Sequence, residues 1–145
     1  MPPTGTTPSP QPTVEAVVAS LGSYSVEAYY FIQQGIHLAT ERVHGPYSEE
    51  KSRPGTRHVS GRQLCETLRD LAIERWGYMA SVVLRSWGLK ATSDFGRLVF
   101  AFVDAGHWQK TPNDSIHDFE SVYSFRDAFD QRYQIKISEK AVKRD

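Results

Sequence analysis

Apolar residues recur at three- and four-residue spacing in five segments of this chain, and a glycine follows each segment. This spacing places the apolar side chains on one face of an α-helix, and glycine is the residue that most often ends a helix. We therefore expect helices over 14–21, 26–43, 61–76, 78–87 and 93–105. Because each helix must bury its apolar face against another element, the expected fold class is mainly α: a compact helical domain.

The expected core consists of the apolar faces of these helices, and segment 93–105 has the fullest apolar stripe. Its members are Ile32, Ile36, Leu64, Leu68, Leu71, Val83, Leu84, Trp87, Phe95, Leu98, Val99 and Phe102. Hydroxyl residues precede the helices and are expected to cap them: Thr13, Ser25, Ser60, and either Thr92 or Ser93. Ser60 and Gln63 have the spacing of a capping box.

The pattern is weaker after Gly106, and there we expect a small β-hairpin. Its strands would lie in 107–111 and 119–125, on either side of a turn at 112–115 that is rich in turn-forming residues. The alternative for 119–125 is a turn of helix, and a short helix is expected at 125–132. A third short strand is expected at 134–137, where polar and apolar residues alternate. Helices followed by a hairpin are also the order of a winged helix, so the middle of the chain has a winged-helix-like interpretation.

The 145 residues fit a single domain, which we place at 13–137. Residues 1–12 contain five of the eight prolines and no charged side chain, so they are expected to be a disordered tail. Residues 138–145 are expected to fray as a C-terminal tail. The segment 45–58 is polar and rich in helix breakers, which predicts an exposed loop.

Composition argues against several classes of protein. Cys65 is the only cysteine, so no intramolecular disulfide can form and a reducing compartment is favoured. No apolar stretch approaches the roughly 20 residues of a membrane span, and the N-terminus lacks the basic and apolar regions of a secretory signal. We therefore expect a cytoplasmic protein with no membrane partner.

Cysteine and histidine are the residue types that could act as a nucleophile or a metal ligand in this chain. Cys65 falls near the start of the expected helix 61–76, where the helix dipole would lower the pKa of a thiol, but a buried apolar cysteine is the favoured interpretation. His37 and His44 lie two helical turns apart, about 10 Å, which is too far for both to bind one metal ion. We therefore predict no metal site and no cofactor, and a cluster that the fold forms with Asp114, His117 or Asp118 stays open as the alternative. Paired carboxylates for acid–base chemistry could come from Asp114, Asp118, Glu120, Asp127 and Asp130, but a solvated acidic face is the favoured interpretation.

The most suggestive stretch surrounds the expected start of the helix 61–76. Free backbone N–H groups, the helix dipole and basic side chains together suit an anion such as a phosphate or a carboxylate. The predicted anion-binding residues are Arg57, His58, Ser60, Gly61 and Arg62. A capped helix with solvated basic neighbours explains the same residues and stays open as the alternative.

Binding to nucleic acid is the weaker interpretation of the basic middle of the chain. Residues 51–90 carry eight basic and three acidic side chains, although the net charge of the whole chain is zero. The helix that would enter the major groove, 93–105, has Arg97 as its only cation, beside Asp94 and Asp104. A protein that reads DNA usually makes many phosphate contacts through Lys and Arg.

Several short motifs occur in a fixed order: His58–Gly61, Trp76-Gly77, Trp87-Gly88, Thr92–Gly96 and Asp118-Phe119. In these motifs, over roughly residues 14–130, the chain resembles a small family of uncharacterised bacterial proteins of the planctomycete and verrucomicrobial type. The resemblance implies a bacterial, cytosolic, single-domain protein. It designates no catalytic residue.

From these observations we expect a non-enzymatic binding or regulatory module. It would engage a protein or a small anionic ligand through the region 57–62. One alternative is a small enzyme whose site is assembled from His, Asp and Glu residues that are distant in the sequence. The other alternative is a nucleic-acid binder with a winged-helix-like middle.

Overall fold

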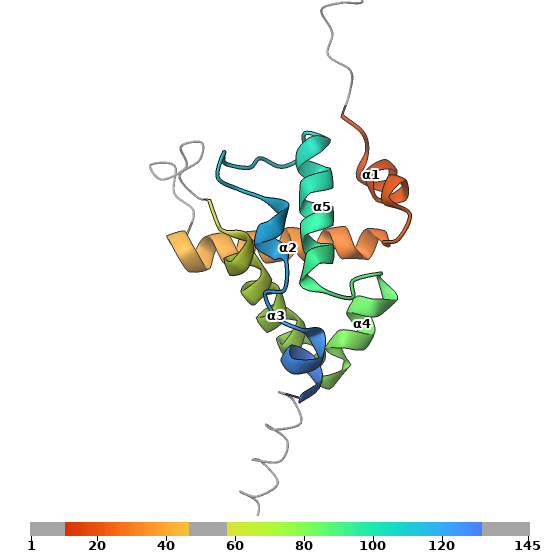
Figure 1. The fold of residues 1–145 in the computed structure, drawn as a ribbon, viewed down its shortest axis with the longest axis vertical. Helices are drawn as coiled ribbons and strands as arrows, with labels where there is room; N and C mark the ends of the chain where they lie inside the picture. The colour runs from red at the N-terminus through yellow and green to blue at the C-terminus, as the bar shows by residue number, and fades with distance from the viewer. Residues whose placement is uncertain (1–10, 47–57, 132–145) are drawn as a thin grey trace, which may run out of the picture.

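The computed structural model describes residues 11–46 and 58–131 (Figure 1). Its α-helices are α1 (Val14–Leu21), α2 (Val26–His44), α3 (Gly61–Trp76), α4 (Ala80–Ser86) and α5 (Thr92–Asp104). Shorter turns of helix are η2 (Gly77–Met79), η3 (Ile116–Phe119) and η4 (Arg126–Gln131). The mainly α fold class is therefore confirmed. The expected tails lie outside the described residues except for Gln11 and Pro12, and so does most of the expected loop 45–58.

The core lies where the long helices cross. In Figure 1, α5 crosses α2, and α3 runs obliquely away from α2. The apolar faces meet there, and Ile32, Leu68 and Phe102 are fully buried. The contact between α2 and α3 is close at Gly35: a Cβ added there would lie 2.2 Å from Cδ2 of Leu68. A glycine on α2 thus lets the two helices approach each other.

The expected core is largely present. All of its members are buried except Ile36, Val83, Trp87 and Val99, which are half-buried. The structure adds three aromatic residues from the C-terminal part of the described chain: Phe119, Phe125 and Phe129. The short helix expected at 125–132 is present as η4, but the burial of these rings depends on contact with distant helices, which a local pattern does not show.

The helix starts follow local hydrogen bonding. Thr13 Oγ1 accepts from the backbone N of Ala16 at 3.1 Å, as expected of a cap. The capping box at α3 is complete, since Ser60 Oγ accepts from Gln63 N at 3.1 Å and Gln63 Oε1 accepts from Ser60 N at 2.9 Å. Ser25 holds the N-cap position of α2, but its side chain makes no capping hydrogen bond.

The cap expected for α5 was wrong. Its N-cap is Ala91, and Thr92 lies inside the helix and is buried. The carboxylate of Asp94 performs the capping instead: Oδ2 accepts from Lys90 N at 2.8 Å and from Ala91 N at 3.1 Å. The Thr92 hydroxyl oxygen accepts from Val122 N at 3.3 Å, so it holds the C-terminal segment rather than the helix start.

The β-hairpin expected over 107–125 was also wrong, because every residue of this segment is in a turn, a bend, coil or a short helix. Local side chains hold the backbone in turns instead: Asp114 Oδ2 accepts from Thr111 N, and Asp118 Oδ2 accepts from Ser115 N. The segment therefore supplies no wing for a winged helix. The third expected strand, 134–137, lies outside the described residues.

Candidate functional site

A pocket of about 610 Å³ lies between α2, the start of α3, α5 and the segment 107–119. In Figure 1 this segment runs beside α5 and then passes the start of α3. Pockets of roughly 300–1,000 Å³ are typical of small-molecule sites. Its lining includes Ile36, His37, Thr40, Glu41, His58, Val59, Ser60, Gly61, Leu64, Val99, Phe100, Val103, His107, Trp108, Gln109, Lys110, Thr111, Asp114, Asp118 and Phe119.

The apolar part of the pocket is built around Phe119. A Cβ on Gly61 would lie 2.9 Å from Cε2 of Phe119, and a Cβ on Gly96 would lie 2.8 Å from its Cβ. The two glycines, one on α3 and one on α5, therefore leave the space that the Phe119 side chain fills. Leu64 is also buried, while Phe100 is half-buried, with its ring centroid 6.3 Å from that of Phe119. The result is an apolar surface fixed by tight packing.

The polar part of the pocket centres on a histidine–aspartate pair. His58 Nε2 lies 2.9 Å from Oδ1 of Asp114, whose side chain is 17% exposed. Asp114 is held in turn, because its Oδ2 accepts from Thr111 N at 2.7 Å. Among the described residues, no hydrogen bond engages Nδ1 of His58. The imidazole is thus oriented by a carboxylate, and it can bind an anion when protonated or accept a proton when neutral.

Lys110 supplies a cation to the same pocket. Its Nζ lies 5.9 Å from the centroid of the Phe100 ring, a cation–π arrangement. In the part of the chain that the structure describes, no carboxylate lies within 4.0 Å of this ammonium group. Asp114, an acidic residue of the same pocket, contacts His58 instead of Lys110. The pocket therefore presents an ammonium group that has no internal counter-ion among the described residues.

The structure brings together part of the predicted anion-binding set. His58, Ser60 and Gly61 all line the pocket, whereas Arg57 lies outside the described residues. Arg62 does not line the pocket: its side chain is 79% exposed, and its Nε lies 3.4 Å from Oε1 of Glu66. The binding of an anion to this set stays a prediction.

The sequence did not predict how two residues of this site come together with His58. Asp114 was expected in a turn and as one of several carboxylates that the fold could bring to a histidine, without an indication of which histidine, and Lys110 was expected only as part of a strand. The path of the segment 107–119 brings Asp114 to His58 and Lys110 to the same pocket, and a local pattern does not encode that path. The alternative of a site assembled from distant residues comes closest to describing this arrangement.

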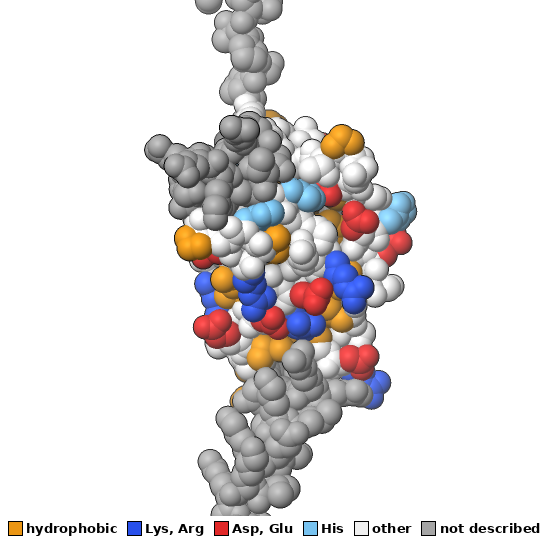
Figure 2. Space-filling view, turned by 90° about the vertical axis from the view of Figure 1, so that its left-hand side faces the viewer, with side chains coloured by type: hydrophobic (Ala, Val, Ile, Leu, Met, Phe, Trp, Pro, Cys, Tyr) orange, Lys and Arg blue, Asp and Glu red, His pale blue; other side chains and the backbone are white. Residues whose placement is uncertain are grey.

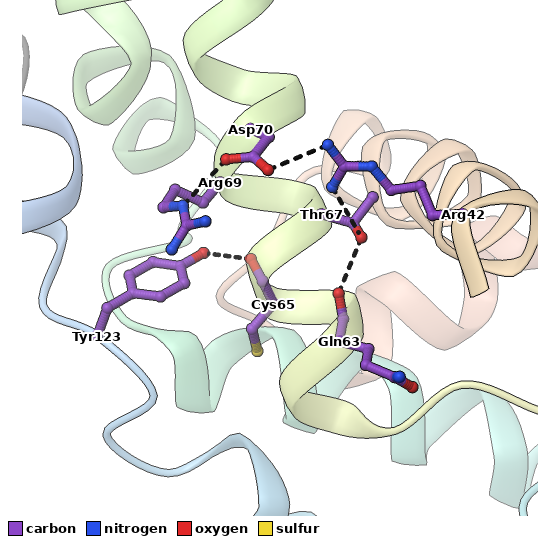
Figure 3. A network of polar contacts seen from close by, with 7 residues as sticks. All are labelled: Arg42, Gln63, Cys65, Thr67, Arg69, Asp70 and Tyr123. Atoms are coloured by element: carbon purple, nitrogen blue, oxygen red, sulfur yellow. Dashed lines mark hydrogen bonds and ion pairs between the residues drawn. The ribbon is translucent and has the colours of Figure 1, made fainter.

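Cys65 is fully buried, which confirms its interpretation as a core residue. Burial, with a smaller effect from Glu66, raises the pKa of its thiol to about 12. Its backbone carbonyl accepts a hydrogen bond of 2.7 Å from the hydroxyl of Tyr123, and burial also raises the pKa of that phenol (Figure 3). A neutral, enclosed thiol is a poor nucleophile.

The polar network of Figure 3 links α2 to α3. Arg42 Nη2 lies 3.1 Å from Oδ2 of Asp70, and Arg42 Nη1 donates to the Thr67 hydroxyl at 3.3 Å. Arg69 Nε contacts the other oxygen of Asp70 at 3.1 Å. These charges pair with one another, so the network serves to hold the helices together.

Three further observations concern metal ligands, membrane spans and surface charge in the part of the chain that the structure describes. They contain no group of three His, Cys, Asp or Glu side chains that could hold a metal ion. None of the helices in 11–46 and 58–131 has the length and apolar character of a membrane span. Figure 2 shows basic and acidic side chains interspersed on one face of the molecule.

Comparisons of the chain with protein-family models, with curated proteins and with solved structures found no match. The resemblance to an uncharacterised bacterial family therefore stays an expectation.

Proposed function

We propose that this domain is a binding module that holds a small organic ligand in the pocket between α2, α3 and α5. The observation that carries the proposal is the combination of an apolar surface around Phe119 with convergent polar groups at His58 and Lys110. Pockets that bind small molecules typically combine these two features. The sequence left open whether the partner is a protein or a small anionic ligand, and the size of the pocket favours the small ligand.

The anionic character expected of the ligand is part of this proposal. His58, Ser60 and Gly61 supply one wall of the pocket, and Lys110 adds a cation that the sequence pattern did not include. A cytoplasmic location and membership of a bacterial family complete the proposal, and both derive from the sequence.

Filling the pocket tests whether it is a binding site. We expect an uncharged naphthylamine fluorophore, which brightens in apolar surroundings, to show saturable emission with the wild-type protein. Val103→Trp places a large ring on a half-buried position of the lining and should abolish that signal. Val83→Trp is the matched control, since Val83 is half-buried on α4 and lies outside the lining.

Circular dichroism would verify that both variants fold. Emission that does not saturate, or that survives Val103→Trp unchanged in a folded protein, contradicts the proposal.

The oriented imidazole of His58 favours a second candidate, a small hydrolytic enzyme. His58 would act as a general base: Nδ1 takes a proton from water as the water oxygen attacks an ester carbonyl. The alcohol oxygen then leaves with a proton returned from the imidazole. Asp114 would position the ring, as a carboxylate does in known catalytic triads.

Hydrolysis of p-nitrophenyl butyrate tests this candidate. Turnover should fall about a hundredfold or more in His58→Ala, a typical loss for a general base. His117→Ala is the matched control, because His117 also pairs with a carboxylate, Glu120 at 2.8 Å, but outside the pocket lining. Absence of turnover, or equal turnover in both variants, rules this enzyme out.

A further inference from the structure

We infer that the ligand of this pocket is a monocarboxylate with an apolar body, and that Lys110 binds its carboxylate group. This inference rests on the proposed function and specifies the chemical class of the ligand.

Lys110 is the observation that points to a negative group on the ligand, since it is the one lysine or arginine among the described residues of the lining. Asp114 is engaged by His58 and by Thr111 N, and Asp118 accepts from Ser115 N at 3.0 Å. Glu41 is the remaining acidic residue of the lining, and it is exposed on α2, as Lys110 is exposed on the segment 107–119. Lys110 contacts the face of Phe100 and has no carboxylate partner among the described residues. A ligand carboxylate would supply that partner.

The hydrogen bonds at the start of α3 argue for a carboxylate over a phosphate. A phosphate is typically held by several free backbone N–H groups or by the guanidinium of an arginine. Here one of the first N–H groups of α3, Gln63 N, is taken by the Ser60 hydroxyl, and the guanidinium of Arg62 contacts Glu66 outside the lining. One ammonium group matches the single charge of a carboxylate.

The shape and polarity of the lining indicate the rest of the ligand. Phe119 and Leu64 are buried side chains at the pocket, and Val99, Val103 and Phe100 are half-buried around it. An apolar body would remove the exposed parts of the half-buried side chains from water, which is favourable in proportion to the area covered. The displaced water also lowers the local dielectric and strengthens the attraction between the carboxylate and Lys110.

Isothermal titration of the full chain with three eight-carbon probes tests the inference. The probes are octanoate, octanol and octyl phosphate, which share an apolar body and differ in their head group. We expect octanoate to bind at least about tenfold more tightly than either of the others. Lys110→Met keeps the length of the side chain without its charge, and should reduce the preference for octanoate over octanol to within about twofold.

Lys90→Met is the matched control, since Lys90 is an exposed lysine outside the lining and should leave the preference intact. If octanoate and octanol bind the wild type equally, the inference that the ligand carries a carboxylate is overturned, while the proposed function as a binding site remains. Tighter binding of octyl phosphate assigns the site to phosphate esters and overturns the inference. A preference that survives Lys110→Met removes Lys110 from the site. If none of the three probes binds, both the inference and the proposed function fail.

Discussion

Some single side chains of this domain make contacts that a local sequence pattern does not show, and Asp94 is the clearest case. Its carboxylate accepts from two backbone N–H groups at the start of α5 and from the hydroxyl of Tyr24 at 2.6 Å. Burial and this hydrogen bond raise the pKa of Tyr24 to about 12. One residue thus caps a helix and joins it to the segment between α1 and α2.

Cys65 gives a prediction at the same scale. Burial raises the pKa of its thiol from 9.0 to about 12, so the folded protein should not react with an aromatic disulfide reagent at about pH 8. Denatured protein should react fully, with one thiol per chain. Rapid reaction of the folded protein contradicts the placement of Cys65 in the core.

The same pKa shift sets the sign of a pH dependence. The folded state binds the thiol proton more tightly than the unfolded state, so this contribution to stability is present below pH 9.0 and is lost as the pH rises toward 12. Urea denaturation should therefore show a free energy of unfolding that falls over this range. The fall should be shallower in Cys65→Ala than in wild type, after allowance for the cavity.

Helices are the scale at which the sequence was most informative. The bounds of α1, α2, α3 and α5 match the expected segments within one residue at each end, because caps, glycines and apolar spacing act within a few residues. The expected helix 78–87 is instead a 3₁₀ turn, η2, followed by α4. Gly77, with φ of 53°, separates it from α3.

Phe102 tests the packing of α5. It is fully buried and its ring lies 4.5 Å from that of Tyr29 and 5.1 Å from that of Trp108, between centroids. Phe102→Ala should lower the free energy of unfolding by about 3–5 kcal/mol, through lost burial and a cavity. Val82→Ala, at an exposed position of α4, should change it by less than about 0.5 kcal/mol. Equal urea midpoints for the two variants would show that the α5 stripe does not form the core.

At the scale of the whole molecule, the sequence predicted those parts of the site that a local pattern marks and missed those that depend on contacts between distant segments. His58, Ser60 and Gly61 were predicted as a binding wall because they mark a helix start, which is a local feature. Asp114 and Lys110 join them through a segment that the sequence predicted as a hairpin. That segment is positioned by ring packing, such as Phe119 against α3 and α5, and by side chains that bond to nearby backbone. Neither effect has a period that can be read along the chain.

The place of Phe119 between Gly61 and Gly96 has an evolutionary consequence. The same ring forms the apolar surface of the pocket and fills the contact between two helices. A mutation that enlarged the pocket at this ring would also loosen the fold, and a side chain added at either glycine would collide with it. New ligand preferences in descendants of this protein should therefore arise first at exposed lining positions such as Lys110, while the glycine–phenylalanine contact stays fixed.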